Sequence, residues 1–508
     1  MYTLLPENNN KNKAIKIIHS RDASSSKEFA RIDQLLLILP KKISPVLWRK
    51  VPQGKKIKNL ILRRAKGAVP AAEVRLNNKR QTRVLVGKVS PNSDTFAELT
   101  LGRKLISAAT TEKSNCIGIW VLGFDSRDQT RIAKNIVAAI LAAGFVMPSF
   151  KSTNSFAKIR NIRIIDLKEK INFDRESAEA EGNNLARWLT ALPPNKLDAE
   201  AYTKLLQELS EQNGWQFKKF GVSALKKLGA GAFLAVAQGN ENDSAAIVRL
   251  RYRPNVKSAT PILSLVGKGI IFDTGGTNLK PFTSMLDMHT DMQGSAVAVG
   301  TLLTISKLKL PYAIDCWLAI TENRTGPSAY KSQDVVKAAN DKTIQTIHTD
   351  AEGRMVLADT LVFASRENPG LIIDYATLTG SCVIAVTTQY SGVFTNRPDW
   401  HPILKKTGHN SGERVWPFPI NKEFLPEIKS EIADLKQCAP NGGGDHILAA
   451  VFLNEFIEND VPWIHVDLSA GTHKGGLAHI LTDITGFGVR YTMSLILDQQ
   501  ILDQADWM

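Results

Sequence analysis

From residue 261 onward, short apolar runs alternate with segments whose apolar residues recur at helical spacing, and this alternation constrains the fold most strongly. Strands are predicted for five apolar runs, at residues 261–266, 312–320, 343–348, 371–375 and 463–468. Helices are predicted for the segments 291–308, 353–365 and 486–497. Strands that alternate with helices form sheets with substantial parallel character, covered on both faces. We therefore expect an α/β domain that binds ligands on loops leaving the carboxyl ends of its strands.

The first part of the chain predicts a second α/β unit. Its expected strands and helix are the segments 35–39, 117–122, 130–145 and 162–165. A charged, helix-prone stretch from Asp166 to Leu192 follows, and Pro193 and Pro194 close it. A chain of 508 residues is too long for one ordinary core. The expected parts are an N-terminal α/β domain (1–170), a linker helix (171–195) and a C-terminal domain (196–508).

Positive charge is concentrated at the N-terminal end. Residues 1–100 contain 21 Lys and Arg against 7 Asp and Glu, which gives +14 of the total net charge of +15. Such a segment permits binding to DNA or another polyanion, or oligomer contacts. A solvated basic surface is the plainer interpretation, because the basic clusters carry no interleaved aromatic residues that would stack on bases.

Cysteine usage and the N-terminus indicate a cytoplasmic protein. The four cysteines are scattered without a CxxC pair, which argues against a disulfide scaffold or a thiolate zinc site and suits a reducing compartment. The N-terminus lacks a signal-peptide pattern. The longest apolar run, from Ile136 to Met147, has 12 residues and is too short to span a bilayer. We expect no membrane association.

Two short windows carry acidic and basic side chains at predicted strand ends. The first runs from Gly267 to Lys280 and is followed by Asp287 and Asp291, and the second is Thr349–Arg354. Divalent metals that activate water need several oxygen ligands on rigid elements. Asp350 and Glu352 are two residues apart, so in extended backbone their side chains leave on the same side. Taken singly, Asp350 is equally typical of a helix cap, so these residues alone favour a metal or phosphate site only moderately.

The windows resemble a known family. Val266–Gly276 and Thr349–Arg354 are similar to the two signature stretches of the leucine (cytosol) aminopeptidase family, and the similarity continues through Ala230–Gly239, Asp291–Gly294 and Ala376–Gly380. It covers about residues 185–500. The resemblance implies an N-terminal α/β domain joined by a helix to a C-terminal α/β/α two-metal exopeptidase domain, assembled as a homohexamer.

By this resemblance, two divalent ions (Mn²⁺ or Zn²⁺) would be held by five side chains: Lys268, Asp273, Asp291, Asp350 and Glu352. Asp273 and Glu352 would bridge the two ions. Lys268 binds a metal only as a neutral amine, so its pKa would have to fall far below the free value of roughly 10.4.

The resemblance also implies a mechanism. A metal-bridging water would attack the peptide bond after the N-terminal residue, with leucine-type or broad specificity. Lys280 would stabilise the oxyanion, and Arg354 would hold a bicarbonate ion that carries the proton from the water to the leaving amine. The substrate cleft would be lined by Met288, Thr377, Leu378 and Gly380.

Some positions depart from the family pattern. His348 replaces the usual Asn, His289 stands where a basic residue is common, and Gln293 replaces a Gly. The segments 443–448 and 467–472 each run one residue longer in a region that helps to form the first side-chain pocket. Because these are not ligand positions, we expect the metal site to be retained.

Other functions have weaker support. Gly229-Ala230-Gly231 lacks the third glycine of a dinucleotide fingerprint, and neither a GxSxG nor a GxxxxGK motif occurs. His446 and His473 show no paired metal-ligand spacing, so polar contacts are expected for both. A catalytically dead scaffold is disfavoured because all seven metal and catalytic positions are intact. The alternative from another class is a nucleic-acid-binding protein that acts through the basic N-terminal domain.

Overall fold

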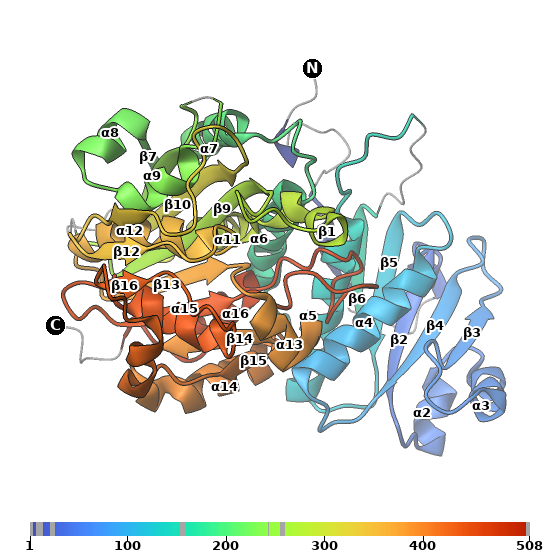
Figure 1. Cartoon of the computed structure of the whole chain (residues 1–508). Coiled ribbons are helices and arrows are strands. Elements are labelled where there is room, and N and C mark those ends of the chain that lie inside the picture. Colours follow the sequence, from blue (N-terminus) through green and yellow to red (C-terminus); the bar gives the residue numbers. More distant parts are fainter. Residues whose placement is uncertain are drawn as a thin grey trace. The chain divides into compact units, whose positions relative to one another are not determined.

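The computed structural model describes residues 4–6, 14–20, 26–152, 159–241, 243–254 and 260–503 (Figure 1). These residues form a mixed α/β structure, as the sequence predicts. One compact unit contains residues 5–180 with 474–483, and the other is built on Glu181–His473 and the segment that begins at Ile484. The boundary falls within α6 (Asp174–Thr190), which lies in the stretch expected as the linker.

The N-terminal unit is a parallel sheet with one antiparallel edge strand. Its strands, in spatial order, are β1 (Lys16–Ser20), β6 (Asn161–Ile165), β5 (Cys116–Val121), β2 (Gln34–Pro40), β4 (Arg83–Val89) and β3 (Ala72–Arg75). Alternate residues of β2 enter different cores. Leu36 and Ile38 pack with α4 (Thr95–Ala109) and α5 (Ser126–Gly144), whereas Leu35 and Leu37 pack with residues of α3 (Gly54–Arg63). The sheet is therefore covered on both faces.

The C-terminal unit is built on an eight-stranded sheet. Its strands, in spatial order, are β15 (Val415–Pro417), β14 (Ser391–Thr395), β17 (Trp463–Asp467), β13 (Leu371–Ala376), β9 (Leu263–Asp273), β10 (Ile314–Asn323), β8 (Ala246–Tyr252) and β7 (Gln216–Gly221). The four central strands, from β17 to β10, run parallel. Their carboxyl ends therefore meet at one edge, which is where ligands bind in such sheets.

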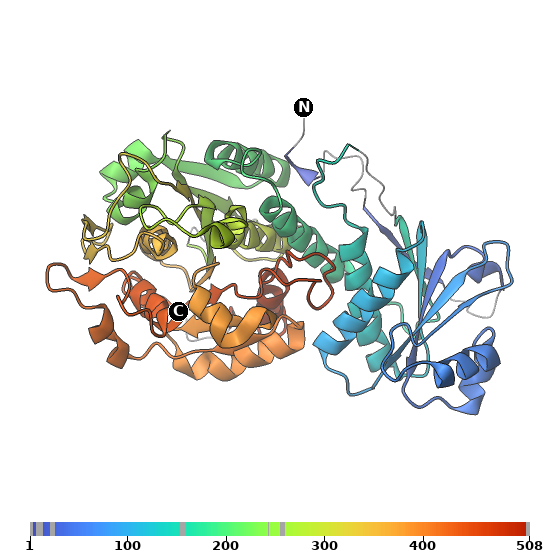
Figure 2. The ribbon, with the colours of Figure 1, turned by 45° about the vertical axis from the view of Figure 1, so that its right-hand side comes forward.

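Helices cover both faces of this sheet (Figures 1 and 2). One core cluster joins α9 (Gly231–Ala237), α12 (Glu352–Arg366) and α15 (Asp445–Asn454) to Val266 and Ile270 of β9. The opposite face carries α11 (Gln293–Lys307), α16 (Val489–Leu497), α7 (Ala199–Asn213) and α14 (His401–Ser411). A Cβ on Gly267 would lie 2.5 Å from Cα of Ser295 in α11, so this close approach of helix and strand requires glycine.

The remaining elements are short. The helices are α1 (Ser26–Phe29), α2 (Pro45–Lys50), α8 (Val222–Lys227), α10 (Phe282–Met285) and α13 (Gly380–Val386), and the 3₁₀ helices are η2 (Met288–Thr290), η3 (Thr387–Gln389), η4 (Pro398–Trp400) and η5 (Lys422–Ile428). The four cysteines are buried and unpaired. In the part of the chain that the structure describes, no helix is long and apolar enough to cross a membrane.

The predicted strand at 343–348 is partly wrong. Only Thr343–Gln345 forms a strand, β12, and it belongs to a three-stranded sheet with β11 (Val335–Lys337) and β16 (Leu435–Lys436) rather than to the large sheet. The reason is that its polar side chains need polar partners: the Thr343 hydroxyl donates to Asp434, and the Gln345 amide oxygen accepts from Ser430.

Candidate metal centre and substrate loop

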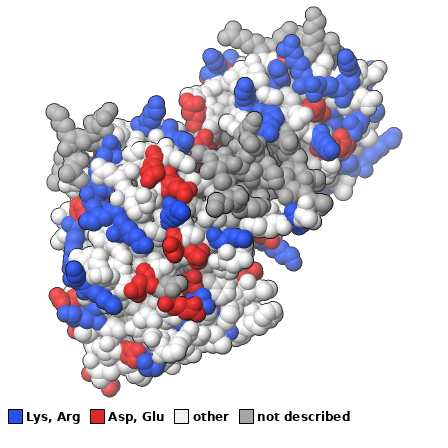
Figure 3. Space-filling model, turned by 90° about the horizontal axis from the view of Figure 1, so that it is seen from above, with Lys and Arg blue, Asp and Glu red and all other residues white. Residues whose placement is uncertain are grey.

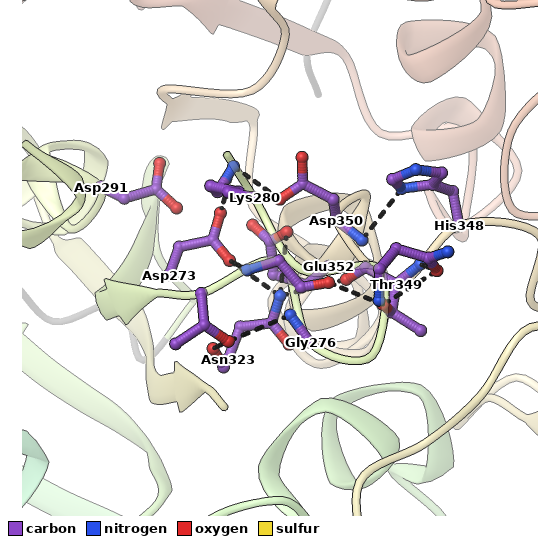
Figure 4. A network of polar contacts seen from close by, with 12 residues as sticks. Asp273, Gly276, Lys280, Asp291, Asn323, His348, Thr349, Asp350 and Glu352 are labelled. Carbon is purple, nitrogen blue, oxygen red and sulfur yellow. Dashed lines mark hydrogen bonds and ion pairs between the residues drawn. The ribbon is translucent and has the colours of Figure 1, made fainter. Parts of the chain in front are cut away.

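The five expected metal ligands lie near the carboxyl ends of the central strands, and Figure 4 shows four of them: Asp273, Asp291, Asp350 and Glu352. Lys268 and Asp273 belong to β9, and Asp291 follows η2 directly before α11. Asp350 and Glu352 lie at the start of α12. Carboxylate oxygens of Asp273, Asp350 and Glu352 all lie within 4.8 Å of one another, close enough to share a metal cluster.

Lys268 is the central cation of this group. Its side chain is 3% exposed, and Nζ lies 2.8 Å from Asp291 Oδ2 and 2.9 Å from Glu352 Oε1. The ammonium also donates a hydrogen bond to the Thr377 carbonyl at 2.9 Å. Gly353 makes room for it, because a Cβ at that position would lie 2.7 Å from the Lys268 Cε. Gly353 of the second signature stretch therefore leaves the space that the Lys268 side chain of the first stretch fills.

Lys280 pairs with the opposite side of the cluster. Its Nζ lies 2.8 Å from Asp273 Oδ2 and 2.5 Å from Asp350 Oδ1 (Figure 4). The chain returns to this point through Gly275, whose φ of +86° suits glycine, and the Gly275 N–H donates to Asp273 Oδ1 at 2.8 Å. The ammonium thus stands beside two carboxylates with its side chain 13% exposed.

The extended geometry expected for Asp350 and Glu352 is wrong. Ala351 is the N-cap of α12, and Glu352 is its first residue, so the two carboxylates converge through a turn rather than along a strand. Ala351 has no side chain that could cap, and the Asp350 carboxylate does not cap the helix either. The Asp350 N–H instead donates to His348 Nδ1 at 3.3 Å. His348, which departs from the family pattern, therefore stabilises the turn that carries Asp350.

Thr349 ties the two signature windows together. Its hydroxyl donates to the Gly275 carbonyl at 2.6 Å and accepts from the Asn278 N–H at 2.8 Å. Its own N–H donates to the Asn278 side-chain oxygen at 2.8 Å. These contacts hold the loop after β9 against the turn before α12, so the acids of both windows share one site.

Asn323 is a site residue that the sequence analysis missed. It is buried at the end of β10, and its amide donates to Asp273 Oδ1 at 2.8 Å and to the Thr349 carbonyl at 3.0 Å. The predicted strand 312–320 stops three residues short of it. A polar residue just beyond a predicted strand of a parallel sheet is the signal that could have found Asn323.

The carboxylates are crowded enough to hold protons in the absence of cations. Burial, and then the nearby Asp273 charge, raise the pKa of Glu352 to about 8. Burial and Asp273 also raise the pKa of Asp291 to about 6, against the lowering effect of Lys268. Burial opposes the charge on Lys268, but Asp291, Glu352 and Asp273 together raise its pKa above the ordinary value.

These groups fit a pair of divalent cations. Four carboxylates and one amine converge in a buried space, and oxygen-rich sets with nitrogen are typical of Mn²⁺ and Zn²⁺ sites. Cations would neutralise the mutual repulsion that raises the carboxylate pKa values. They would also compete with the proton of Lys268, which frees its nitrogen lone pair.

The expected substrate residues of the 377–380 segment lie beside the cluster. The Thr377 hydroxyl donates to Asp291 Oδ1 at 2.7 Å. Asp467, at the end of β17, accepts from the Leu378 N–H at 3.2 Å and from the Thr379 hydroxyl at 2.7 Å. Asp467 is 1% exposed and was not identified from the sequence, although it opens one of the departing segments. It fixes the loop that leads into α13.

Met288 and Gly380 lie at more open positions. Met288 begins η2 and is half-buried. Gly380 is exposed, and a Cβ there would meet nothing within 4 Å. Both positions therefore have space around them that a substrate side chain can use.

Arg354 is buried in the first turn of α12, two residues after Glu352. Its Nη2 lies 2.7 Å from Asp445 Oδ2, and its Nη1 donates to the Gln437 carbonyl at 3.2 Å. Asp445, like Asn323 and Asp467, was not identified as a site residue from the sequence. His446 and His473 make the expected polar contacts, with the hydroxyls of Ser381 and Thr388 respectively.

The pKa values predict that metal binding strengthens with pH. At pH 6 the metal-free site carries protons on Glu352, whose pKa is about 8, and on Lys268, and Asp291, whose pKa is about 6, is half protonated. Bound cations must displace these protons, so affinity should rise between pH 6 and pH 8 by about tenfold per pH unit for each proton released. Titration calorimetry with Mn²⁺, in buffers of different ionisation enthalpy, measures both the affinity and the number of protons released. Affinity that is flat with pH and unaccompanied by proton release would contradict this account.

Comparison with known proteins identifies the family of this chain. Residues 184–493 match the model of the cytosol aminopeptidase family, catalytic domain. A probable cytosol aminopeptidase of Prochlorococcus marinus (strain AS9601) is 35% identical over 430 residues, which cover 82% of this chain and 85% of that protein. A probable cytosol aminopeptidase of Roseiflexus castenholzii (strain DSM 13941 / HLO8) is 33% identical over 459 residues, which cover 87% of this chain and 90% of that protein.

A solved structure is similar over nearly the whole chain. It is the bottromycin maturation enzyme BotP in complex with Mn, with a TM-score of 0.78 and 26% sequence identity, covering 92% of this chain and 99% of that one. The sequence and structure matches together confirm the family that the two signature stretches predict. This chain belongs to the cytosol aminopeptidase family of metallo-exopeptidases.

Proposed function

We propose that this chain is a two-metal aminopeptidase that releases the N-terminal residue of peptides. The observation that carries the proposal is the convergence of the Lys268 amine and four carboxylates at the carboxyl ends of parallel strands, beside the 377–380 loop. The proposed metal ligands are Lys268, Asp273, Asp291, Asp350 and Glu352. The Mn in the similar solved structure supports Mn²⁺ as the cation, with Zn²⁺ as the alternative.

Two bound cations would supply an activated water and polarise the scissile carbonyl. The chain's own residues would do the rest. Lys280 presents its ammonium beside Asp273 and Asp350, where it can stabilise negative charge that develops on the carbonyl oxygen. Thr377 contacts Asp291 of the cluster. Thr377, Leu378 and Gly380 would position the substrate backbone, with the Leu378 carbonyl as an acceptor. Met288 would line the pocket for the first side chain.

Arg354 is the proposed anion-binding residue. Its guanidinium is buried two residues from Glu352, so an anion held there lies next to the ligand set. The family resemblance names bicarbonate as that anion, with the task of moving the proton from water to the leaving amine. The fork of N–H donors suits a planar anion, and lysine would replace it poorly.

We further propose leucine-type or broad specificity, a homohexamer and a cytoplasmic location, all of which follow from the family resemblance. A second role, contact with a polyanion such as DNA or with other subunits, is supported by exposed basic residues on α3: Lys55, Lys56, Lys58 and Arg63. Figure 3 (upper right) shows further Lys and Arg side chains over the visible face of the N-terminal unit.

Metal-dependent release of leucine tests the peptidase directly. Purified protein, stripped of metal and then given Mn²⁺ or Zn²⁺, should hydrolyse leucine amide. Asp350→Ala should reduce kcat/KM by roughly a thousandfold or more, because the cluster loses a ligand. Asp341→Ala is the matched control, since the Asp341 side chain is 85% exposed. If metal-loaded, folded protein releases nothing from any amino-acid amide tested, the enzyme proposal fails and the basic surface becomes the remaining candidate.

Asp467→Asn tests how the substrate loop is held. The amide would place an N–H₂ against the Leu378 N–H or the Thr379 hydroxyl, which leaves a buried donor unpaired at a cost of about 1–3 kcal/mol. We expect kcat/KM to fall roughly tenfold, mostly through KM, with metal content unchanged. Asp460→Asn, at a side chain that is 88% exposed, is the control. An unchanged KM would show that Asp467 does not position the loop.

A further inference from the structure

We propose that the Asp445 carboxylate is the anion that Arg354 holds, so that this chain works without bicarbonate. This inference rests on the proposed function and specifies one of its parts. The chain carries its own anion at the position where the family resemblance implies a dissolved one.

The guanidinium of Arg354 is enclosed and already paired. The residue is 1% exposed, so its charge needs a nearby anion. Nη2 lies 2.7 Å from Asp445 Oδ2, and Nη1 donates to the Gln437 carbonyl at 3.2 Å. Gln437 is itself fixed, because its side chain accepts from the His348 N–H and donates to the Ala351 carbonyl. The direction of the guanidinium is therefore set by the turn before α12.

The loop before α15 brings Asp445 to this place. Gly442 and Gly444 have φ values of +64° and +66°, which let the chain turn sharply into the helix that Asp445 begins. Asp445 lies within the 443–448 segment, which runs one residue longer than the family pattern. Burial would raise the pKa of Asp445, but Arg354 lowers it below the ordinary value, so the side chain is an anion at neutral pH.

A planar anion binds a guanidinium best through two N–H groups on one edge. Both usable edges, Nη1 with Nη2 and Nε with Nη2, draw on Nη2, and Asp445 engages one of the two N–H groups of that nitrogen. Nε has no hydrogen-bond partner within the described residues, so a bicarbonate could approach only along the Nε edge, directly beside the Asp445 carboxylate. Its charge would also be repelled by the neighbouring carboxylate. Asp445 thus supplies the negative charge that balances Arg354 and disfavours a second anion beside it.

Kinetics in bicarbonate-free buffer test the inference. Mn²⁺-loaded wild-type protein should hydrolyse leucine amide at the same rate with and without added bicarbonate. Asp445→Ala should lose roughly tenfold in kcat without bicarbonate and regain most of it when bicarbonate fills the vacated edge. Asp445→Asn, which keeps the side-chain shape and the start of α15, should lose activity similarly and should regain less of it than Asp445→Ala when bicarbonate is added. Saturable activation of the wild type by bicarbonate would overturn the inference, and so would an Asp445→Ala variant whose kcat does not change when bicarbonate is added.

A second readout does not depend on hydrolysis. Relaxation of ¹³C-bicarbonate should be enhanced by Mn²⁺-loaded Asp445→Ala and not by the wild type, because only the variant should hold the ion beside the cluster. The double variant Asp445→Ala/Arg354→Ala should lose the enhancement. Equal enhancement by the wild type and by Asp445→Ala would contradict the inference. Failure of the proposed function would appear differently, as absence of leucine amide hydrolysis in the wild type.

Discussion

The burial of Lys268 among carboxylates is the constraint on which the rest of the catalytic unit depends. Its side chain is 3% exposed and lies within 2.9 Å of both Asp291 and Glu352. Removing one partner from such a buried pair costs about 3–5 kcal/mol, so each group needs the others. Burial and the neighbouring Asp273 charge nevertheless outweigh the effect of the two lysines, so the pKa of Glu352 is raised. Such a cluster is suited to exchanging its protons for cations.

The fold supports this cluster from several sides of one sheet edge. Asn323 closes it from β10, Thr349 ties its two sequence windows together, and Asp467 reaches from β17 to hold the substrate loop. The same edge carries Arg354, whose charge is met by Asp445 from the start of α15. Binding, orientation and charge balance therefore come from loops that leave neighbouring parallel strands, which is the common placement of sites in this class of sheet.

Much of this arrangement could be predicted because it depends on local sequence patterns. Strand and helix periodicity predicted the central sheet, and the signature stretches predicted the five side chains that the structure brings together and that we propose as metal ligands. The contacts of Asn323, Asp445 and Asp467 could not be predicted, because each depends on partners 26 or more residues away. The strand assigned to 343–348 was partly wrong for a related reason: only two of its six residues are apolar, and the polar contacts of Gln345 hold it in a small separate sheet.

Anomalous diffraction from crystals soaked in Mn²⁺ tests the central claim most directly. The account predicts two peaks, roughly 3.5–4 Å apart, between the five proposed ligands, with the Lys268 nitrogen turned from its acidic partners onto one ion. The deprotonated amine would then no longer donate to Asp291. A single peak, no peak, or two ions with Lys268 still paired to Asp291 would contradict the claim that this buried lysine is held for metal.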